Sequence, residues 1–347
     1  MPKLPTLRHR KKVFTDIQTL DVLATILETP RHIVELNAAT PQYNMFTVPK
    51  KNGERRLIEN PIAPLKAIQG KLNDFMQAVY WFIKPPSAYG FIINPDKSLE
   101  PPRSILTNAQ QHLGKAWLLN ADLEDFFHFV TAEQVFQVLL RPPFDFSEKV
   151  ADTITRLTTL NGRLPMGAPT SPVLSNLVFM PMDADLLTYS ANHEWHFTRY
   201  ADDMSFSSER EIEWVKTIAL EDIVKKYGFL FKKEKVKLFG PDDVKLVTGL
   251  RLDNVEGRVE LPDDFSVSFA KEMDRLKGIL SVQSRLWHED VDWVRQYKQQ
   301  IDGKLSFAVQ ILGENHPDFI ALTKQYNAAI EPPDEYDSIS WLDFNYF

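Results

Sequence analysis

The stretch that most constrains the fold of this chain is residues 197–207, F-T-R-Y-A-D-D-M-S-F-S. Two short runs that alternate apolar and polar residues flank an adjacent pair of carboxylates, which is the pattern of a β-hairpin. We therefore expect Asp202 and Asp203 at the hairpin tip, both charged and close together. Adjacent carboxylates repel one another, so a fold that fixes such a pair in a partly dry cleft typically holds a hard cation there. Taken alone, the pair is more typical of an acidic surface turn.

A third carboxylate follows a second buried run. Residues 117–127, W-L-L-N-A-D-L-E-D-F-F, begin with an apolar stretch that ends at Asp122. A carboxylate at the end of a buried strand is a favourable ligand position for a hard cation. We therefore expect Asp122 to join Asp202 and Asp203 in one metal site.

A basic hairpin precedes these acids. Residues 45–61, M-F-T-V-P-K-K-N-G-E-R-R-L-I-E-N-P, contain two extended runs around Asn52-Gly53, a dipeptide typical of a tight hairpin turn. The turn is flanked by four cations, namely Lys50, Lys51, Arg55 and Arg56. Such a cluster suits phosphate, because Arg offers a bidentate fork and Lys a point charge. An exposed hairpin that is charged only for solubility is the alternative.

Composition narrows the class of protein. With 347 residues, of which 44% are hydrophobic, the chain can bury a large core and divide into two or three subdomains. The absence of cysteine excludes disulfides, thiolate zinc sites and a cysteine nucleophile, and is typical of a reducing compartment. No apolar run approaches the length that spans a bilayer, and the basic N-terminus lacks an apolar segment. We therefore expect a cytoplasmic protein with no membrane partner.

The net charge of −7 is unevenly distributed. Residues 1–12 carry five basic residues and no acid, whereas residues 313–347 carry seven acids and one lysine. Local charge predicts partners better than the total does, so a nucleic-acid partner is compatible with this composition. The acidic and aromatic tail at 331–347 is interpreted as a partner-docking segment or a mobile end.

Three further segments complete the pattern. Residues 164–177, L-P-M-G-A-P-T-S-P-V-L-S-N-L, place a loop of small residues before a helix, where a flat ligand can lie against the backbone. Residues 232–237 are basic, and apolar residues at helical spacing from Pro262 onward predict a helical bundle.

No G-x-G-x-x-G or Walker A loop is present, so nothing indicates a dinucleotide enzyme or a P-loop ATPase.

In this order the segments resemble the polymerase domain of reverse transcriptases. Y-A-D-D at 200–203 looks like their motif C, and Asp122 looks like the motif A aspartate. L-P-M-G-A-P-T-S-P at 164–172 is similar to motif B, and G-F-L-F-K-K-E-K-V at 228–236 to motif D, with Lys235 in the lysine position. A single Y-x-D-D match arises readily by chance, whereas four ordered motifs do not.

Two more motifs resemble the bacterial retron branch of this family. They are N-A-Q-Q-H at 108–112 and V-T-G at 247–249. The resemblance covers about residues 45–255. Met166 stands where relatives usually have Gln, and Lys232 where motif D usually has Asn. The first departure leaves open how the pocket contacts the incoming nucleotide.

The resemblance implies an α+β, right-hand polymerase fold with fingers, a palm built on an antiparallel sheet, and a helical thumb. The expected divisions are a helical lead-in at 1–44, fingers at 45–115, a palm at 116–255 with a fingers portion near 130–170, a helical thumb at 256–330, and the acidic aromatic tail at 331–347.

The resemblance also implies nucleotidyl transfer assisted by two Mg²⁺ ions, which lower the pKa of the primer hydroxyl and neutralise charge on the phosphates. Asp122, Asp202 and Asp203 would bind the metal. The residues expected at the incoming nucleotide are Lys50, Arg55, Arg56, Phe127, Met166 and Lys235.

Two of these residues have specific implied roles. Phe127 lies five residues after Asp122, where an aromatic ring would exclude a 2′-hydroxyl from the sugar site. Lys235 would protonate the leaving pyrophosphate. A plain core phenylalanine and a solvated lysine are the alternatives. The residues expected to contact RNA are Asn108, His112, Lys271, Arg275 and Lys277.

The implied activity is that of the RNA-directed DNA polymerase of a retron. Such an enzyme copies a structured non-coding RNA, recognised through helix shape and 2′-hydroxyl groups, into a branched RNA-DNA product (msDNA) from dNTPs. The resemblance also implies a role in anti-phage defence with an effector protein, for which the acidic tail is a candidate dock. The alternatives are another bacterial reverse transcriptase, of the group II intron or diversity-generating type, and a nucleic-acid-bound scaffold that mainly restrains an effector.

Overall fold

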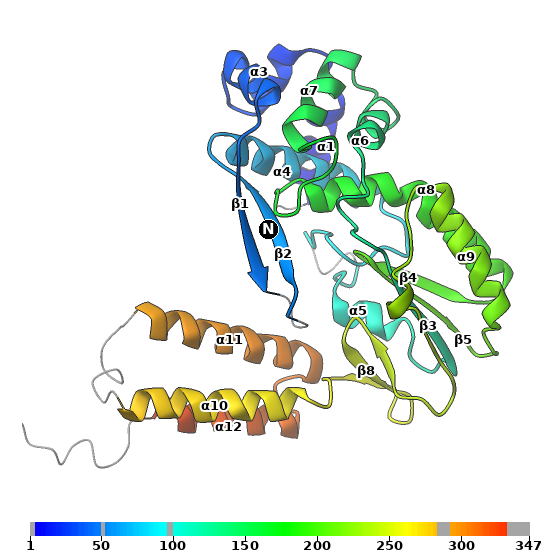
Figure 1. The fold of residues 1–347 in the computed structure, drawn as a ribbon, viewed down its shortest axis with the longest axis vertical. Coiled ribbons are helices and arrows are strands. Elements are labelled where there is room, and N and C mark those ends of the chain that lie inside the picture. Colours follow the sequence, from blue (N-terminus) through cyan, green and yellow to red (C-terminus); the bar gives the residue numbers. More distant parts are fainter. Residues whose placement is uncertain (1–3, 50–52, 96–99, 283–291, 332–347) are drawn as a thin grey trace, which may run out of the picture. The chain divides into compact units, whose positions relative to one another are not determined.

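The computed structural model describes residues 4–49, 53–95, 100–282 and 292–331 (Figure 1). The chain divides into two units, Met1–Asp243 and Val244–Phe347, and each is described by itself. The first unit contains the aspartates, the basic hairpin and the loop of small residues. The second contains a small sheet and the C-terminal helices.

The first unit begins with four helices, and the first of them packs on the fourth, which is the longest. Apolar residues at helical spacing, among them Phe14, Leu23 and Leu72, are buried in a common core. The helices are α1 (Leu4–Thr15), α2 (Leu20–Ile26), α3 (Arg31–Ala39) and α4 (Leu65–Ile83).

The basic hairpin expected at 45–61 is confirmed. Strands β1 (Tyr43–Pro49) and β2 (Arg55–Pro61) pair antiparallel, with Pro49 opposite Arg55. Gly53 has a φ of +85°, a backbone conformation that glycine adopts without steric cost. Asn52, Lys50 and Lys51 lie outside the described residues.

A four-stranded antiparallel sheet in the order β4-β5-β3-β6 forms the centre of the first unit. Its strands are β3 (Trp117–Asp122), β4 (His196–Tyr200), β5 (Asp203–Ser208) and β6 (Lys237–Phe239). Strands β4 and β5 form the hairpin expected at 197–207, and their turn consists of Ala201 and Asp202 because Tyr200 pairs with Asp203.

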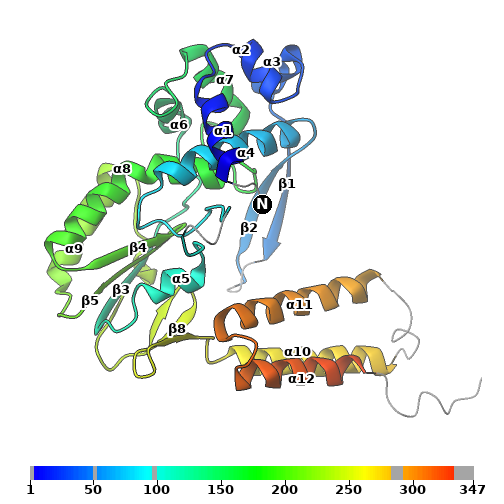
Figure 2. The same cartoon turned by 180° about the vertical axis from the view of Figure 1, so that it is seen from behind.

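Helices beside this sheet complete the first unit (Figure 2). Helix α8 contacts strand β4 and helix α9, and the ring of Phe179 on α8 stacks on Phe126, with centroids 5.0 Å apart. The helices are α5 (Ile105–Gln110), α6 (Ala132–Leu139), α7 (Glu148–Thr158), α8 (Ser171–Asn192) and α9 (Trp214–Lys226), with a 3₁₀ turn η1 at Lys233–Lys235.

The second unit opens with a three-stranded antiparallel sheet in the order β7-β8-β9. The V-T-G segment is the turn between the first two strands, since Val247 pairs with Leu250 and both Thr248 and Gly249 have positive φ, as a type I′ turn requires. The strands are β7 (Lys245–Val247), β8 (Leu250–Asp253) and β9 (Arg258–Glu260).

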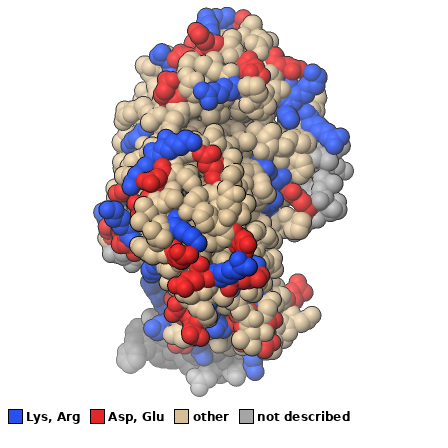
Figure 3. All heavy atoms as spheres, turned by 90° about the vertical axis from the view of Figure 1, so that its right-hand side faces the viewer, with Lys and Arg blue, Asp and Glu red and all other residues tan. Residues whose placement is uncertain are grey.

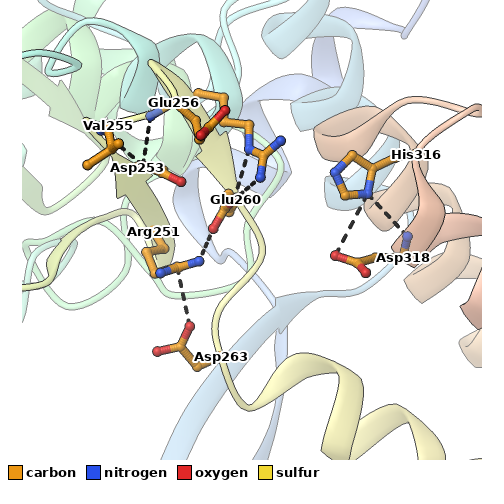
Figure 4. Close-up of polar contacts among 9 residues, drawn as sticks. Arg251, Asp253, Val255, Glu256, Glu260, Asp263, His316 and Asp318 are labelled. Atoms are coloured by element: carbon orange, nitrogen blue, oxygen red, sulfur yellow. Dashed lines mark hydrogen bonds and ion pairs between the residues drawn. The ribbon is translucent and has the colours of Figure 1, made fainter.

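Polar contacts hold the ends of this sheet (Figure 4). The Asp253 carboxylate accepts the backbone N–H groups of Val255 and Glu256, both at 3.0 Å, and thereby closes the β8–β9 turn. Arg251 pairs with Glu260 on the neighbouring strand.

Three helices follow, as the apolar spacing from Pro262 onward predicts. They are α10 (Phe265–Val282), α11 (Asp292–Leu312) and α12 (Pro317–Ile330). Phe269, Leu276 and Ile301 belong to their buried core. The Nδ1 atom of His316 accepts the Asp318 N–H at 3.2 Å and caps α12 (Figure 4).

The α+β class with an antiparallel sheet is confirmed. The boundaries expected for the lead-in, fingers, palm, thumb and tail remain predictions, and residues 332–347 of the tail lie outside the described residues. None of the described helices has the length and hydropathy needed to span a bilayer.

Candidate active site

The three aspartates come together at one end of the central sheet. Asp122 is the last residue of β3 and pairs directly with Asp203, the first residue of β5. Asp202 lies in the adjoining turn, where its carbonyl oxygen accepts the Leu123 N–H at 3.0 Å. Asp122 and the adjacent pair Asp202 and Asp203 are about 80 residues apart in the sequence, yet the sheet brings their three carboxylates into one small region.

Crowding and burial shift the protonation of this cluster. Burial raises the pKa of Asp203 to about 7, and the charges of Asp122 and Asp202 add to the effect. Burial likewise raises the pKa of Asp202. The charge of Asp122 raises this pKa further, whereas the charges of Lys235 and Arg56 lower it. Ionising all three groups therefore calls for a nearby positive charge.

Lys235 supplies part of that charge. Its ammonium group pairs with the Asp122 carboxylate from the turn η1. Burial lowers the pKa of Lys235, but the hydrogen bond to Asp122 and the three carboxylates outweigh burial and raise it. The lysine therefore stays protonated beside the aspartates at neutral pH.

The carboxylates suit a hard cation by their chemistry. All three offer oxygen ligands, the donors that Mg²⁺ prefers, and their mutual repulsion would be relieved by a bound cation. Within the described ranges, no group of three or more Asp, Glu or His side chains is arranged so that it could hold a metal ion. The Asp122 carboxylate is paired with Lys235. The donor set fits magnesium, and the ligand roles remain predictions.

The turn that carries Asp202 rests on a buried arginine that the sequence analysis missed. Arg199 is fully buried and forms a bidentate ion pair with Asp183 on α8, with both N–O distances 2.7 Å. Its Nη1 atom also donates to the Asn176 side chain at 3.1 Å and to the Ala201 carbonyl at 3.0 Å. The guanidinium therefore supports the carbonyl directly before Asp202.

Residues 87–91 also contact this turn and the end of strand β4. Arg199 donates its N–H to the Ser87 carbonyl, and its own carbonyl accepts the Tyr89 N–H, both at 2.8 Å. A Cβ on Gly90 would lie 2.5 Å from the Ala201 nitrogen, so only glycine fits there. Ala201 itself has a φ of +59°, which is uncommon for a residue with a side chain. The available signal was that Arg199 stands two residues after Phe197, at an apolar position of the alternation, and a buried arginine needs partners.

Besides Lys235 on η1, the residues expected at the nucleotide lie on three segments of the first unit. Arg56 is exposed on β2, and its charge lowers the pKa of Asp202, so it lies on the side of the aspartates. Arg55 is exposed on the same strand and donates to the Thr47 hydroxyl at 2.7 Å. Lys50 lies outside the described residues.

Phe127 and Met166 occupy the other two segments. The half-buried ring of Phe127 packs against Phe126 and Phe91, with centroid distances of 5.0 and 6.0 Å. The backbone of Met166 is hydrogen-bonded to Glu59 on β2, so the loop of small residues lies against the basic hairpin. Their contacts with a nucleotide remain predictions.

Asn108 and His112 are buried. Helix α5 ends at Gln110, and His112 follows it, with its ring between Thr198 on β4 and Ser207 on β5 at 2.7 Å from each hydroxyl. This position suits a group that orients the RNA-binding surface better than one that touches RNA directly. Their role in RNA binding remains a prediction.

The basic residues expected in the thumb are exposed on α10. Arg275 lies over the ring of Tyr297, 5.7 Å from its centroid, and Lys271 and Lys277 are exposed on the same helix. On the face of the molecule shown in Figure 3, basic and acidic side chains are interspersed over the described residues. RNA binding by α10 remains a prediction.

Comparison with known proteins shows what this chain is similar to. Residues 48–252 match the family model of the reverse transcriptases (RNA-dependent DNA polymerases). The chain is 33% identical to the Retron Ec86 reverse transcriptase of Escherichia coli, over 60% of this chain and 62% of that protein. It is 30% identical to the Retron Mx65 reverse transcriptase of Myxococcus xanthus, over 76% of this chain and 60% of that protein.

The aligned regions thus span less than two thirds of the length of these two relatives. Another relative, the Retron Ec73 reverse transcriptase of Escherichia coli, is 26% identical over 77% of this chain and 82% of that protein. Among solved structures, telomerase from Candida albicans superposes with a TM-score of 0.46 at 9% identity, over 88% of this chain and 66% of that chain.

Proposed function

This chain belongs to the reverse transcriptase family, and from that premise we propose that it is the RNA-directed DNA polymerase of a retron. The observation that carries the proposal is the meeting of Asp122, Asp202 and Asp203 at one end of an antiparallel sheet. The similarity to retron enzymes, together with the N-A-x-x-H and V-T-G motifs, favours this branch over intron and diversity-generating enzymes.

In the proposed mechanism, Asp122, Asp202 and Asp203 would hold two Mg²⁺ ions. Bound metal would lower the pKa of the attacking hydroxyl and neutralise charge that develops on the phosphates. The Asp122 carboxylate would exchange its contact with Lys235 for this cation.

The remaining groups act on the nucleotide. Arg55 and Arg56 hold the triphosphate through charge-assisted hydrogen bonds, as cationic side chains commonly do in phosphoryl transfer. Lys235, protonated beside the aspartates, delivers a proton from Nζ to the leaving pyrophosphate. Phe127 lies under the sugar and excludes a 2′-hydroxyl.

The substrates follow from the family. The template and primer are a structured non-coding RNA, the product is a branched RNA-DNA (msDNA) made from dNTPs, and the enzyme acts in the cytoplasm. We include in the proposal an effector protein as partner in anti-phage defence, with the tail at 331–347 as its docking segment.

The decisive experiment combines a variant with a product analysis. The protein is purified from a host that carries its neighbouring genes, and the nucleic acid bound to it is sequenced. We expect RNA joined to DNA through a 2′-branch for the wild type and no DNA for Asp202→Asn/Asp203→Asn. The control variant Asp21→Asn/Asp152→Asn, which neutralises two exposed acids on α2 and α7, should make the wild-type product.

Two outcomes would change the proposal. DNA synthesis by the Asp202→Asn/Asp203→Asn variant would overturn the metal assignment. A variant that makes no DNA but still supports phage defence would show that restraint of an effector, not synthesis, is the main role.

A further inference from the structure

Glu59 is a buried carboxylate that the proposed mechanism leaves without a role. It lies on β2, three residues after Arg56, and only 1% of its surface is exposed. A buried acid is costly unless its oxygens are fully paired, so its partners indicate why the fold retains it.

Three groups from two other segments converge on this side chain. Arg163 binds it in a bidentate manner, with Nη1 and Nη2 at 2.9 and 3.0 Å from the two carboxylate oxygens. The Met166 N–H donates to the same carboxylate at 3.1 Å. The Nε2 atom of His128 lies 3.3 Å from it.

The backbone reinforces the connection. The Glu59 N–H donates to the Met166 carbonyl at 2.7 Å, so both polar groups of the Met166 backbone are bonded to one residue of β2. Gly167 has a φ of +120°, and a Cβ there would lie 2.9 Å from Ile58. The loop therefore approaches the strand as closely as a glycine permits.

The electrostatics favour an ionised Glu59. Burial alone raises its pKa, but the Arg163 guanidinium, the Met166 N–H and His128 outweigh burial and hold the pKa below its ordinary value. An ionised carboxylate accepts hydrogen bonds with both oxygens, so it can hold all three partners at once.

The three segments that meet at Glu59 carry all the proposed nucleotide contacts of the described residues except Lys235 on η1. Strand β2 carries Arg55 and Arg56, the segment before helix α6 carries Phe127 next to His128, and the loop before α8 carries Met166.

We propose that Glu59 is a positioning residue of the nucleotide pocket, which fixes Phe127 and Met166 relative to the arginines of β2. This inference rests on the proposed polymerase function. It implies that Glu59 affects how tightly a dNTP is bound and how well its sugar is distinguished from ribose, although it touches neither.

Primer extension with single nucleotides tests the inference, using Glu59→Gln, which keeps the shape of the side chain but removes its charge. We expect the KM for dNTPs to rise about 10- to 100-fold, with a smaller change in kcat, because small misplacements of binding groups cost about this much. The preference for dNTPs over rNTPs should fall in parallel. Glu28→Gln removes an exposed acid that pairs with Lys71 and should leave both quantities unchanged.

A second variant covers the case in which Glu59→Gln does not fold. Arg163→Lys keeps the positive charge but loses the bidentate geometry, and should raise the dNTP KM by a smaller factor. A folded Glu59→Gln or Arg163→Lys enzyme with wild-type KM and sugar preference would overturn the inference and leave Glu59 a stabilising residue. If the wild-type enzyme itself extends no primer, the proposed function fails instead, so the two failures are distinguishable.

Discussion

Asp122 and Asp203 are direct cross-strand partners at the ends of β3 and β5, so two carboxylates face each other in a partly buried site. Like charges directly opposite each other on neighbouring strands destabilise a sheet, so this pair lowers the stability of the folded state. Lys235 compensates for part of this repulsion by pairing with Asp122.

Neutralising one of the two acids should therefore stabilise the metal-free protein. We expect Asp203→Asn to raise the free energy of unfolding by about 1 kcal/mol, since it removes the like charge opposite Asp122. Thermal unfolding in a chelating buffer measures the effect, with Asp152→Asn as an exposed control. A lower Tm for Asp203→Asn than for the control would contradict this explanation.

The close approach of residues 87–91 to the turn that carries Asp202 gives a second prediction. Gly90→Ala should lower the rate of DNA synthesis at least about tenfold, because its Cβ would displace the Ala201 backbone and the adjoining Asp202. Gly70→Ala in helix α4 is the matched control, since nothing lies within 4 Å of its Cβ and it should gain up to about 1 kcal/mol of stability. Equal activities of the two variants would show that the turn tolerates the shift.

The buried ion pair between Arg199 and Asp183 gives a third prediction. Asp183→Asn should lower the free energy of unfolding by about 3–5 kcal/mol, because it leaves the Arg199 guanidinium buried without its counter-ion. Glu194→Gln, which breaks the exposed pair with Arg210, should cost less than about 1 kcal/mol. Denaturant unfolding followed by circular dichroism compares them, and similar losses for both would refute a special role for Arg199.

The ring of Phe127 gives a prediction about specificity. Phe127→Ala should admit ribonucleotides while synthesis with dNTPs continues, because it opens space beside the sugar. The measurement is the ratio of kcat/KM for dNTPs and rNTPs. Phe129→Ala, at a neighbouring half-buried ring, controls for lost packing. An unchanged ratio in Phe127→Ala would leave the ring a core residue.

His112 gives a prediction about pH. Burial lowers its pKa to about 3 from the ordinary 6.5, with His196 and Lys115 adding to the effect. Above pH 6.5 the ring is neutral in both the folded and unfolded chain, so its contribution to stability is complete. Below this pH, His112 is protonated in the unfolded chain but stays neutral in the folded one. The free energy of unfolding therefore falls by about 1.4 kcal/mol per pH unit until about pH 3.

The comparison is between wild type and His112→Gln, which retains a hydrogen-bonding side chain but does not titrate. At pH 5 the contribution of His112 should have fallen by about 2 kcal/mol relative to pH 7, and this loss should be absent from His112→Gln. His32→Gln, at an exposed histidine, should keep the wild-type slope. Parallel pH profiles for wild type and His112→Gln would refute the assignment.

The sequence by itself determined the local elements and the chemistry of the site. Alternating residues predicted the hairpin at 197–207, because side chains in a strand point to opposite faces. The Asn52-Gly53 dipeptide predicted the hairpin at 45–61. A carboxylate at the end of an apolar run placed Asp122 at the end of a buried strand, next to the aspartates of the hairpin. Residue type alone then indicated a hard cation.

Only the tertiary structure decided what holds these residues in place. Arg199 depends on Asp183 and on the approach of Gly90, and Glu59 depends on Arg163, which lies 104 residues away in the chain. The alternation of apolar and polar residues reports which face of a strand is buried, but it does not report which distant group lies against that face. A charged residue at a buried position of a strand can therefore be recognised in the sequence. Its partner cannot, because the partner lies on a distant segment whose packing is not encoded in any local pattern.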